Sequence, residues 1–218
     1  MNGGRPETDG VPRTLVPRGQ HGARPVVLHV GCGSQSSDLL EREFPKPEWV
    51  EVRLDIDPKV MPDIVASITD MHMIETGAVD TVFSPHNVEH LFTHEVAAAF
   101  SEFARVLPPN GRAVVGVPDL QQVAKLIAED KLLDTAYESA AGPIAPIDMV
   151  YGHRGYVARG HVFMAHRTGF TARSLGEALV QNGFAGADVV RTGFDLWAVA
   201  HKSALAPDRA CEDPSSSA

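Results

Sequence analysis

The chain has 218 residues, 44% of them hydrophobic and 22% charged, which suits one globular domain and is cramped for two. Its net charge of -9 argues against nucleic acid or an anionic membrane as the main partner, because both favour clustered Lys and Arg. Only two cysteines occur, and no apolar run resembles a signal peptide or a membrane span. We therefore expect a cytoplasmic protein without a disulfide framework.

Both ends of the chain differ in composition from its middle. Residues 1–24 are rich in Gly, Pro and Arg, and residues 203–218 are polar, so neither segment has enough apolar side chains to offset the entropy of ordering. We expect two flexible tails and a single domain over residues 25–202.

The first half of this domain alternates strand-like and helix-like segments. Ser36 or Ser37 can cap a helix over residues 37–44, which Pro45 and Pro47 end. Thr93 can cap a second helix over residues 94–107. Short apolar or alternating runs predict strands at residues 25–30, 49–56, 63–67, 79–84 and 112–118. This alternation predicts an α/β fold, a parallel sheet with helices on both faces.

The regular alternation of strand-like and helix-like segments ends after residue 118. Asp119 can cap a long helix over residues 120–140, and residues 142–169 have no clean period. Thr171 can cap a helix over residues 172–182. Two runs, 185–192 and 196–202, are separated by a short turn and predict an antiparallel hairpin.

Glycines follow the first strand, at the end where open α/β sheets bind ligands. Gly31 and Gly33 remove Cβ atoms that would keep a ligand from the backbone. Asp55 ends the second strand about two dozen residues later, where an acid can accept hydrogen bonds from a ribose diol; Asp57 is the alternative. Asp70 follows the third strand and can accept from an adenine amine beside apolar side chains, or act as a simple cap.

Five segments in order resemble the motifs of class I S-adenosylmethionine-dependent methyltransferases, in particular the type 11 group. The resemblance covers roughly residues 25–120 and 171–202 and rests on "VVLHVGCGSQ", "VRLDIDP", "VDTVFSPHNVEHL", "EFARVLPPNGRAVVGVPDL" and "LVQNGF" with its following hairpin. It departs from the family pattern at His29, where an acid is usual, and at Gln35, where a third glycine is common.

The resemblance implies a Rossmann-like sheet of seven strands, mostly parallel with an antiparallel last strand, and S-adenosylmethionine as the cofactor. It implies that the glycine turn lies along the methionine part and that Asp55 holds the ribose. It also implies that Asp70 and Met71 border the adenine and that Ser84–Asn87 closes over the methionine end near the methyl group. The residues expected to bind the cofactor are Gly31, Cys32, Gly33, Asp55, Ile56, Asp70, Met71, Pro85 and His86.

Residues 121–170 form an insertion outside the matched core, and we interpret it as a lid that carries substrate-selecting groups. Methyl transfer from a sulfonium needs alignment, exclusion of water and a base only if the nucleophile arrives protonated. Histidine is the natural base at neutral pH, so the candidate catalytic residues are His86, His161 and His166. Cys32 is interpreted as a small residue chosen for fit, and Trp197 as a core residue.

These observations predict methyl transfer to an oxygen or nitrogen of a small-molecule acceptor, and leave a homodimer open. The alternatives are a non-catalytic protein that binds S-adenosylmethionine, and an NAD-dependent oxidoreductase, whose third glycine would be Ser36. The segment "HNVEH" also fits a His-x-x-Glu-His zinc pattern through His86 and His90. Because the loop after the fourth strand already accounts for it, no metal is expected.

Overall fold

The computed structural model describes residues 22–34 and 38–203. Ser36, Ser37 and most of the two predicted tails lie outside this range. The β-strands are β1 Val26–Val30, β2 Val50–Asp55, β3 Ile64–Val65, β4 Thr81–Pro85, β5 Arg112–Pro118, β6 Tyr137–Ser139, β7 Gly142–Ile144, β8 Gly186–Thr192 and β9 Asp195–His201. The α-helices are α1 Asp38–Glu43, α2 Val96–Val106, α3 Leu120–Ala128, α4 Pro146–Tyr151, α5 Arg154–Ala158 and α6 Ala172–Gln181. Four 3-10 turns are η1 Pro58–Val60, η2 Val88–His90, η3 Thr93–Glu95 and η4 Val162–Met164.

Seven strands form one sheet in the order β3-β2-β1-β4-β5-β9-β8. The first five run parallel to one another, while β9 pairs antiparallel with both β5 and β8. Thr192 and Asp195 are partners in the last hairpin, so only Gly193 and Phe194 form its turn. The predicted sheet of seven strands with an antiparallel last strand is confirmed.

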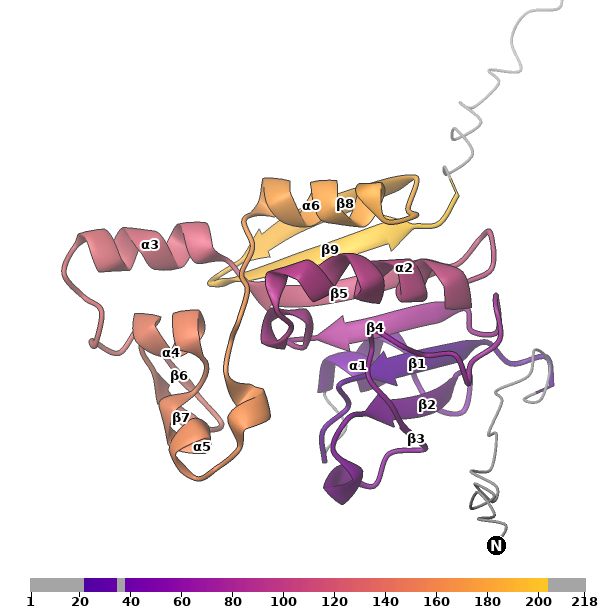
Figure 1. Ribbon diagram of the computed structural model, residues 1–218, viewed down its shortest axis with the longest axis horizontal. Helices are drawn as coiled ribbons and strands as arrows, with labels where there is room; N and C mark the ends of the chain where they lie inside the picture. Colours follow the sequence, from indigo (N-terminus) through magenta and orange to yellow (C-terminus); the bar gives the residue numbers. More distant parts are fainter. Residues whose placement is uncertain (1–21, 35–37, 204–218) are drawn as a thin grey trace, which may run out of the picture.

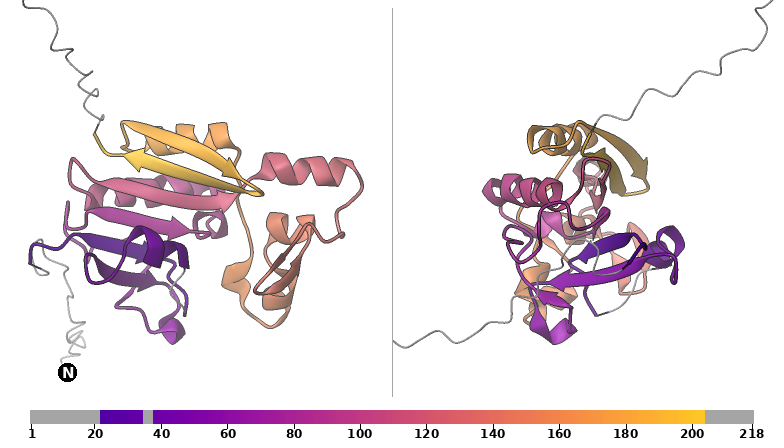
Figure 2. Two further views of the ribbon diagram at one scale, coloured as in Figure 1. Left: turned by 180° about the vertical axis from the view of Figure 1, so that it is seen from behind. Right: turned by 90° about the vertical axis from the view of Figure 1, so that its right-hand side faces the viewer.

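Helices cover the two faces of the sheet unequally. Helices α2 and α6 lie on one face (Figure 1), where Phe100 and Phe103 of α2 and Leu175 and Leu179 of α6 are fully buried. From behind, only α1 lies on the other face among the described helices of the sheet region, and β5, β9 and β8 stay visible (Figure 2). There α1 packs Leu40 against Phe83 of β4. Helices on both faces are thus confirmed.

Two predicted helix starts have different outcomes. Thr171 caps α6 by accepting the Ser174 N–H at 3.3 Å, as predicted. Thr93 does not cap α2: it begins η3, and the Glu95 carboxylate accepts the Phe92 N–H at 2.8 Å instead. The Thr93 hydroxyl lies 3.1 Å from that of Thr168, so a tertiary contact takes the place of the local cap.

The predicted helix over residues 120–140 is wrong in its second half. Asp119 caps α3 as predicted, accepting the Gln121 N–H at 3.0 Å, but α3 ends at Ala128 and Asp130 adopts a left-handed φ of 61°. Residues 137–139 form β6, paired with β7. A continued helix would carry the chain away from the small apolar cluster of Val123, Ile144 and Met149, which forms only because the chain turns back.

The segment of residues 121–170, here called the lid segment, lies beyond the carboxyl ends of β1, β4 and β5 (Figure 1). Its apolar cluster also contacts Phe194 in the turn between β8 and β9. Tyr137 stacks on the Phe194 ring with centroids 5.9 Å apart. The segment is therefore packed against the edge of the sheet where the glycine turn lies. No helix in the described ranges is long and apolar enough to cross a membrane.

One buried carboxylate organises the lid segment. Asp148 accepts N–H groups from Ala145 at 3.0 Å and from the Arg154 backbone at 3.0 Å, and it pairs with the Arg154 guanidinium at 2.8 Å. Burial alone raises the pKa of Asp148, but the Arg154 guanidinium and these N–H groups outweigh burial and lower the pKa to about 2. The charged form is therefore stabilised by folding.

We predict that Asp148→Asn lowers the free energy of unfolding by about 2 kcal/mol at pH 7. The folded-state pKa lies below the ordinary value of 3.8, so this stabilisation is complete above about pH 5 and is lost as the pH falls through 2. The difference between wild type and variant should shrink by roughly half between pH 6 and pH 3 in urea unfolding. Glu129→Gln, which removes an exposed pair with Lys131, is the control and should change little. A pH-independent difference for Asp148→Asn would contradict the assignment.

Candidate active site at the carboxyl edge of the sheet

The glycine turn after β1 needs glycine at two positions for different reasons. Gly31 and Gly33 have φ angles of 63° and 58°, in the left-handed region that favours glycine. A Cβ on Gly31 would lie 2.5 Å from the Asn87 side chain, whereas a Cβ on Gly33 would meet no atom of the described residues within 4 Å. Gly31 therefore allows close contact with the loop after β4, and Gly33 leaves backbone open to a ligand.

Cys32, between these glycines, faces the protein interior and is only 4% exposed. Its N–H donates to the Leu54 carbonyl at 3.2 Å, which ties the turn to β2. Burial raises the pKa of the Cys32 thiol to about 11, so it is not a nucleophile at neutral pH. This agrees with its interpretation as a residue chosen for fit.

Asp55 joins the glycine turn to the end of β2. One carboxylate oxygen accepts the Gly33 N–H and the other accepts the Asp57 N–H, both at 2.9 Å. Arg53 donates to the Gly33 carbonyl from the same strand. A carboxylate has about four acceptor sites, so both oxygens of Asp55 can also accept ligand hydroxyls. The next residue, Ile56, is 50% exposed and offers an apolar surface beside that acid.

The two residues predicted to border an adenine differ in accessibility. Asp70 is exposed, and its carboxylate lies 2.8 Å from Nδ1 of His72, which lowers the pKa of Asp70. Met71 is fully buried in the main core, and its N–H donates to Glu102 at 2.6 Å. The Met71 side chain is therefore covered by α2, and its role beside the adenine stays a prediction.

The loop after β4 holds His86 in an unusual conformation. Pro85 ends β4, and His86 has a φ of 47° while its N–H donates to the Gly116 carbonyl at 2.8 Å. Its ring lies between two carboxylates, with Nδ1 3.4 Å from Glu89 and Nε2 3.6 Å from Asp195. With this left-handed backbone, the His86 ring lies at the carboxyl edge of the sheet, near both Glu89 and Asp195.

The charge of His86 follows from these neighbours. Desolvation lowers its pKa, but Asp195 and Glu89 outweigh desolvation and raise the pKa to about 10. The ring is therefore protonated at neutral pH and donates from both nitrogens. This does not suit the general base predicted from the sequence, since a base must start deprotonated.

Glu89 and Asp195 are site residues that the sequence interpretation missed. Glu89 is 1% exposed, and Asp195 begins β9. A signal for Asp195 existed: because β9 is antiparallel, its first residue lies at the same edge as the carboxyl ends of the parallel strands. For Glu89 the sequence offered only its place as the acid of the His-x-x-Glu-His pattern, and the contact of the lid segment with its backbone appears only in the structure.

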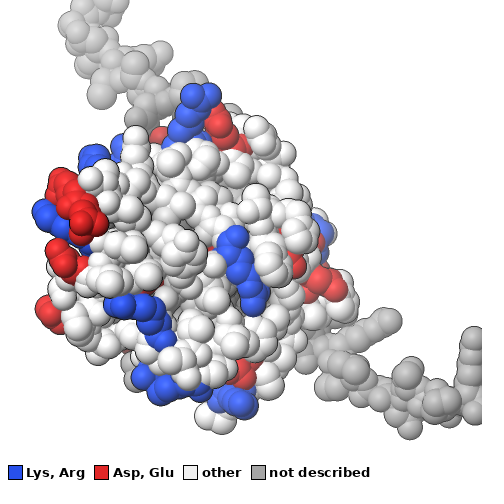
Figure 3. All heavy atoms as spheres, turned by 60° about the vertical axis from the view of Figure 1, so that its left-hand side comes forward, with Lys and Arg blue, Asp and Glu red and all other residues white. Residues whose placement is uncertain are grey.

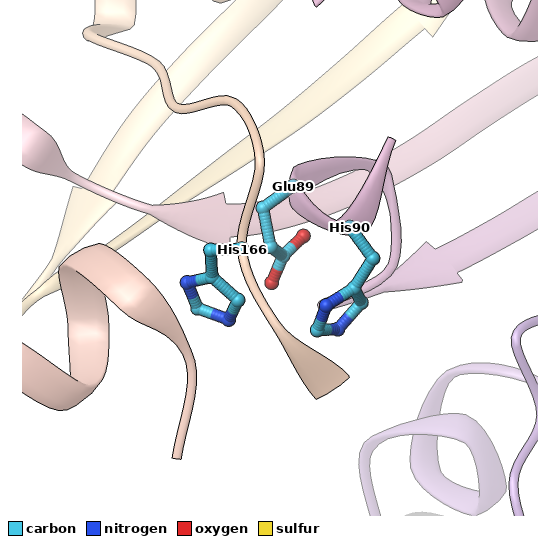
Figure 4. A group of neighbouring side chains, drawn as sticks. All are labelled: Glu89, His90 and His166. Carbon is cyan, nitrogen blue, oxygen red and sulfur yellow. The ribbon is translucent and has the colours of Figure 1, made fainter. Parts of the chain in front are cut away.

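The three predicted catalytic histidines do not gather at one point. His166 lies beside Glu89 and His90, with the His90 and His166 ring centroids 4.9 Å apart (Figure 4). His161 precedes η4 on the exposed surface of the lid segment, where its ring contacts Tyr156. The structure therefore brings His86 and His166 together around Glu89 and leaves His161 apart.

The helical zinc pattern predicted as an alternative is also absent in its expected form. The 3-10 turn η2 spans only Val88–His90, and His86 precedes it. The His86 ring faces Asp195, whereas the His90 ring contacts His166. His86 and His90 therefore do not share a helical face.

Residues 28–115, which include the glycine turn, Asp55 and His86, match the model of a family described as "Methyltransferase domain". The matched residues therefore form a methyltransferase domain, similar to the type 11 group of class I S-adenosylmethionine-dependent methyltransferases. The resemblance seen in the motifs is confirmed, and S-adenosylmethionine is the cofactor of the methyltransferase domain, which favours this interpretation over the NAD-dependent alternative.

Solved structures share the fold of the methyltransferase domain at low sequence identity. A SAM-dependent methyltransferase from Archaeoglobus fulgidus is 14% identical, with a TM-score of 0.55 over 82% of this chain and 86% of that chain. A 1,6-didemethyltoxoflavin-N1-methyltransferase from Burkholderia thailandensis, with bound S-adenosylhomocysteine, is 15% identical, with a TM-score of 0.50 over 85% and 75%. The CMeT domain of the citrinin polyketide synthase is 13% identical, with a TM-score of 0.54 over 83% of this chain and 47% of that chain. The chain thus spans about half the length of the last structure. No curated protein matches the chain.

Proposed function

We propose that this chain methylates an oxygen or nitrogen of a small-molecule acceptor held between the glycine turn and the lid segment. The observation that carries the proposal is the position of the lid segment at the carboxyl edge of the sheet. Its return passes over the loop that bears His86, where the Arg167 and Thr168 N–H groups donate to the Glu89 carbonyl at 2.8 and 3.2 Å. An acceptor at this edge would be enclosed by protein on that side, which favours a small molecule.

The glycine turn and the end of β2 fit S-adenosylmethionine. No atom of the described residues would meet a Cβ on Gly33, so among them the turn is open to a ligand, and Asp55 keeps acceptor sites for the ribose hydroxyls. We assign Ile56 and Asp70 to the adenine, and Pro85 and His86 to the methionine end. When bound, the cofactor supplies an activated methyl carbon for in-line displacement.

The protein's own part is to position the acceptor and to exclude water. His86, protonated between Glu89 and Asp195, can donate a hydrogen bond to a polar group at the reacting end. His161 would come close to the acceptor only if the lid segment moves, and its role as a base stays a prediction.

Charge on the lid side supports a small acceptor over a nucleic acid. On the face in Figure 3, Lys and Arg side chains are dispersed and most of the surface is uncharged. The whole chain has a formal net charge of -9. A polyanion would gain most from a continuous basic patch.

Labelled methyl transfer tests the proposal. Wild-type protein with S-adenosylmethionine tritiated on the methyl group is incubated separately with hydroxyl- and amine-bearing small molecules, peptides and RNA. We expect label in the small-molecule pool only, with kcat about 100-fold lower in His86→Ala. His94→Ala, an exposed histidine near the same loop, is the matched control and should keep the wild-type rate. Label on peptide or RNA would refute the acceptor class, and cofactor binding without any transfer would favour the non-catalytic alternative.

A further inference from the structure

Glu89, His90 and His166 form a compact cluster where η2 meets the return of the lid segment. One ligand atom from each of the three side chains lies within 4.8 Å of the other two. Figure 4 shows the Glu89 carboxylate between the two imidazole rings. Two of the side chains come from the loop after β4, and the third comes from 76 residues later in the chain, so only the fold brings the set together.

Both imidazole rings are oriented by backbone carbonyls. Nδ1 of His90 lies 3.2 Å from the Ala165 carbonyl oxygen, and Nδ1 of His166 lies 2.9 Å from that of Met149. A carbonyl oxygen only accepts, so Nδ1 carries the proton and Nε2 keeps its lone pair in each neutral ring. A metal-binding histidine commonly has this arrangement, with one nitrogen donating to a carbonyl and the other binding the ion.

The Glu89 carboxylate is buried without matching hydrogen bonds. The residue is 1% exposed, and neither carboxylate oxygen has a hydrogen-bond partner among the described residues. Its only close cationic neighbour there is His86, whose Nδ1 lies 3.4 Å away as an ion pair. A buried carboxylate with unused acceptor sites is costly unless a cation or further donors satisfy it.

The position of Glu89 is nevertheless well determined. Its main-chain carbonyl accepts N–H groups from Arg167 and Thr168 of the lid segment, and Arg167 also donates to the His90 carbonyl at 3.3 Å. These bonds hold η2 and the residues around His166 next to each other. The carboxylate therefore points into the cluster because the backbone on both sides is tied.

We propose that Glu89, His90 and His166 bind one divalent transition-metal ion of the Zn²⁺ or Fe²⁺ class. Two imidazole nitrogens and one carboxylate oxygen suit these ions, whereas Mg²⁺ and Ca²⁺ prefer oxygen ligands throughout. Metal–ligand bonds of about 2.0–2.1 Å place neighbouring ligands about 3.4 Å apart, so the side chains would close by up to about 1.4 Å. Three protein ligands leave at least one position for water or another ligand.

The site differs from the helical zinc pattern in its third ligand. His86 is not a ligand, because its two nitrogens face Glu89 and Asp195 as an ion pair. His166 takes that place and comes from the lid segment. The ion would therefore connect the lid segment to the loop after β4, in addition to the hydrogen bonds already there. This inference does not depend on the proposed acceptor or on methyl transfer.

Cobalt binding tests the site without any substrate. Full-length protein treated with a chelator and then dialysed is titrated with Co²⁺ by visible absorption and with Zn²⁺ by calorimetry. We expect one equivalent of each ion and visible cobalt bands typical of nitrogen and oxygen ligands. Glu89→Gln and His166→Ala should each weaken binding at least about 100-fold and remove the bands. His94→Ala, four residues from His90 and exposed, should bind as wild type does.

Two controls separate loss of the site from loss of the fold. Circular dichroism and calorimetry with S-adenosylmethionine establish that each variant is folded, and His90→Ala replaces any variant that is not. Absence of cobalt bands in the wild type, or equal binding by wild type and Glu89→Gln, would overturn the proposal and leave a cluster bridged by water. Weak binding of several ions to the ten histidines, unchanged in the variants, would overturn it as well. An intact cobalt spectrum with no methyl transfer would refute only the proposed function.

Discussion

Asp55→Ala should lower the affinity for S-adenosylmethionine and S-adenosylhomocysteine by at least about 100-fold. The Asp55 carboxylate accepts the Gly33 and Asp57 N–H groups at 2.9 Å each, and we assign its remaining acceptor sites to the ribose hydroxyls. Hydrogen bonds to a charged group contribute about 1.5–3 kcal/mol each, and about 1.4 kcal/mol corresponds to a tenfold change in affinity. Losing two ribose contacts and the order of the glycine turn therefore gives a change of this size. Isothermal titration calorimetry measures it directly.

Asp57→Ala is the matched control for this prediction. Asp57 is two residues away and was the alternative ribose acid in the sequence, but its carboxylate caps η1 by accepting the Lys59 N–H at 2.9 Å. We expect this variant to bind both ligands within about threefold of wild type, since about 0.6 kcal/mol is that factor. Loss of binding in Asp57→Ala with normal binding in Asp55→Ala would reverse the assignment.

Gly31→Ala should destabilise the protein by about 3 kcal/mol or more, and Gly33→Ala by about 1–2 kcal/mol. The two glycines have similar left-handed φ angles, 63° and 58°, so the backbone cost of a Cβ is similar. Only at Gly31 would the new methyl lie 2.5 Å from the Asn87 side chain, whose amide nitrogen is buried. Urea unfolding followed by circular dichroism measures the difference between the variants.

A double variant separates two contributions to the destabilisation by Gly31→Ala: the steric clash with Asn87 and the cost of a left-handed backbone at alanine. In Gly31→Ala combined with Asn87→Ala, the clash is removed, so Gly31→Ala should cost no more in that background than Gly33→Ala costs in the wild type. Equal destabilisation by Gly31→Ala and Gly33→Ala in the wild type would show that the Asn87 side chain moves away from the new methyl at little energetic cost. The close contact between the glycine turn and the loop after β4 would then have little energetic weight.

Local signals in the sequence predicted much of the fold correctly. Side-chain caps at Asp119 and Thr171 begin helices as expected, and the two-residue turn at Gly193 and Phe194 forms the predicted hairpin. These features depend on hydrogen bonds and backbone angles within a few residues, so they are visible in the chain itself.

Errors arose where distant contacts compete with local ones. The helix predicted to reach residue 140 stops at Ala128, because the chain turns back to bury Val123 with Ile144 and Met149. Met71 is buried beneath α2, and its place beside an adenine stays a prediction. Neither outcome can be read from periodicity, since the partners lie about 20–30 residues away in sequence.

The features of the candidate site also fall into two groups, those visible in the sequence and those that depend on the folded structure. The sequence by itself determined the glycine turn, the acid at the end of β2 and the succession of strands and helices along the chain, because local patterns and spacing carry them. Only the tertiary structure decided the charge of His86, which follows from Glu89 and from Asp195 on a strand more than 100 residues later. It also decided that His166 meets Glu89 and His90. Burial and charge depend on what the folded chain places nearby, and that is a property of packing rather than of spacing.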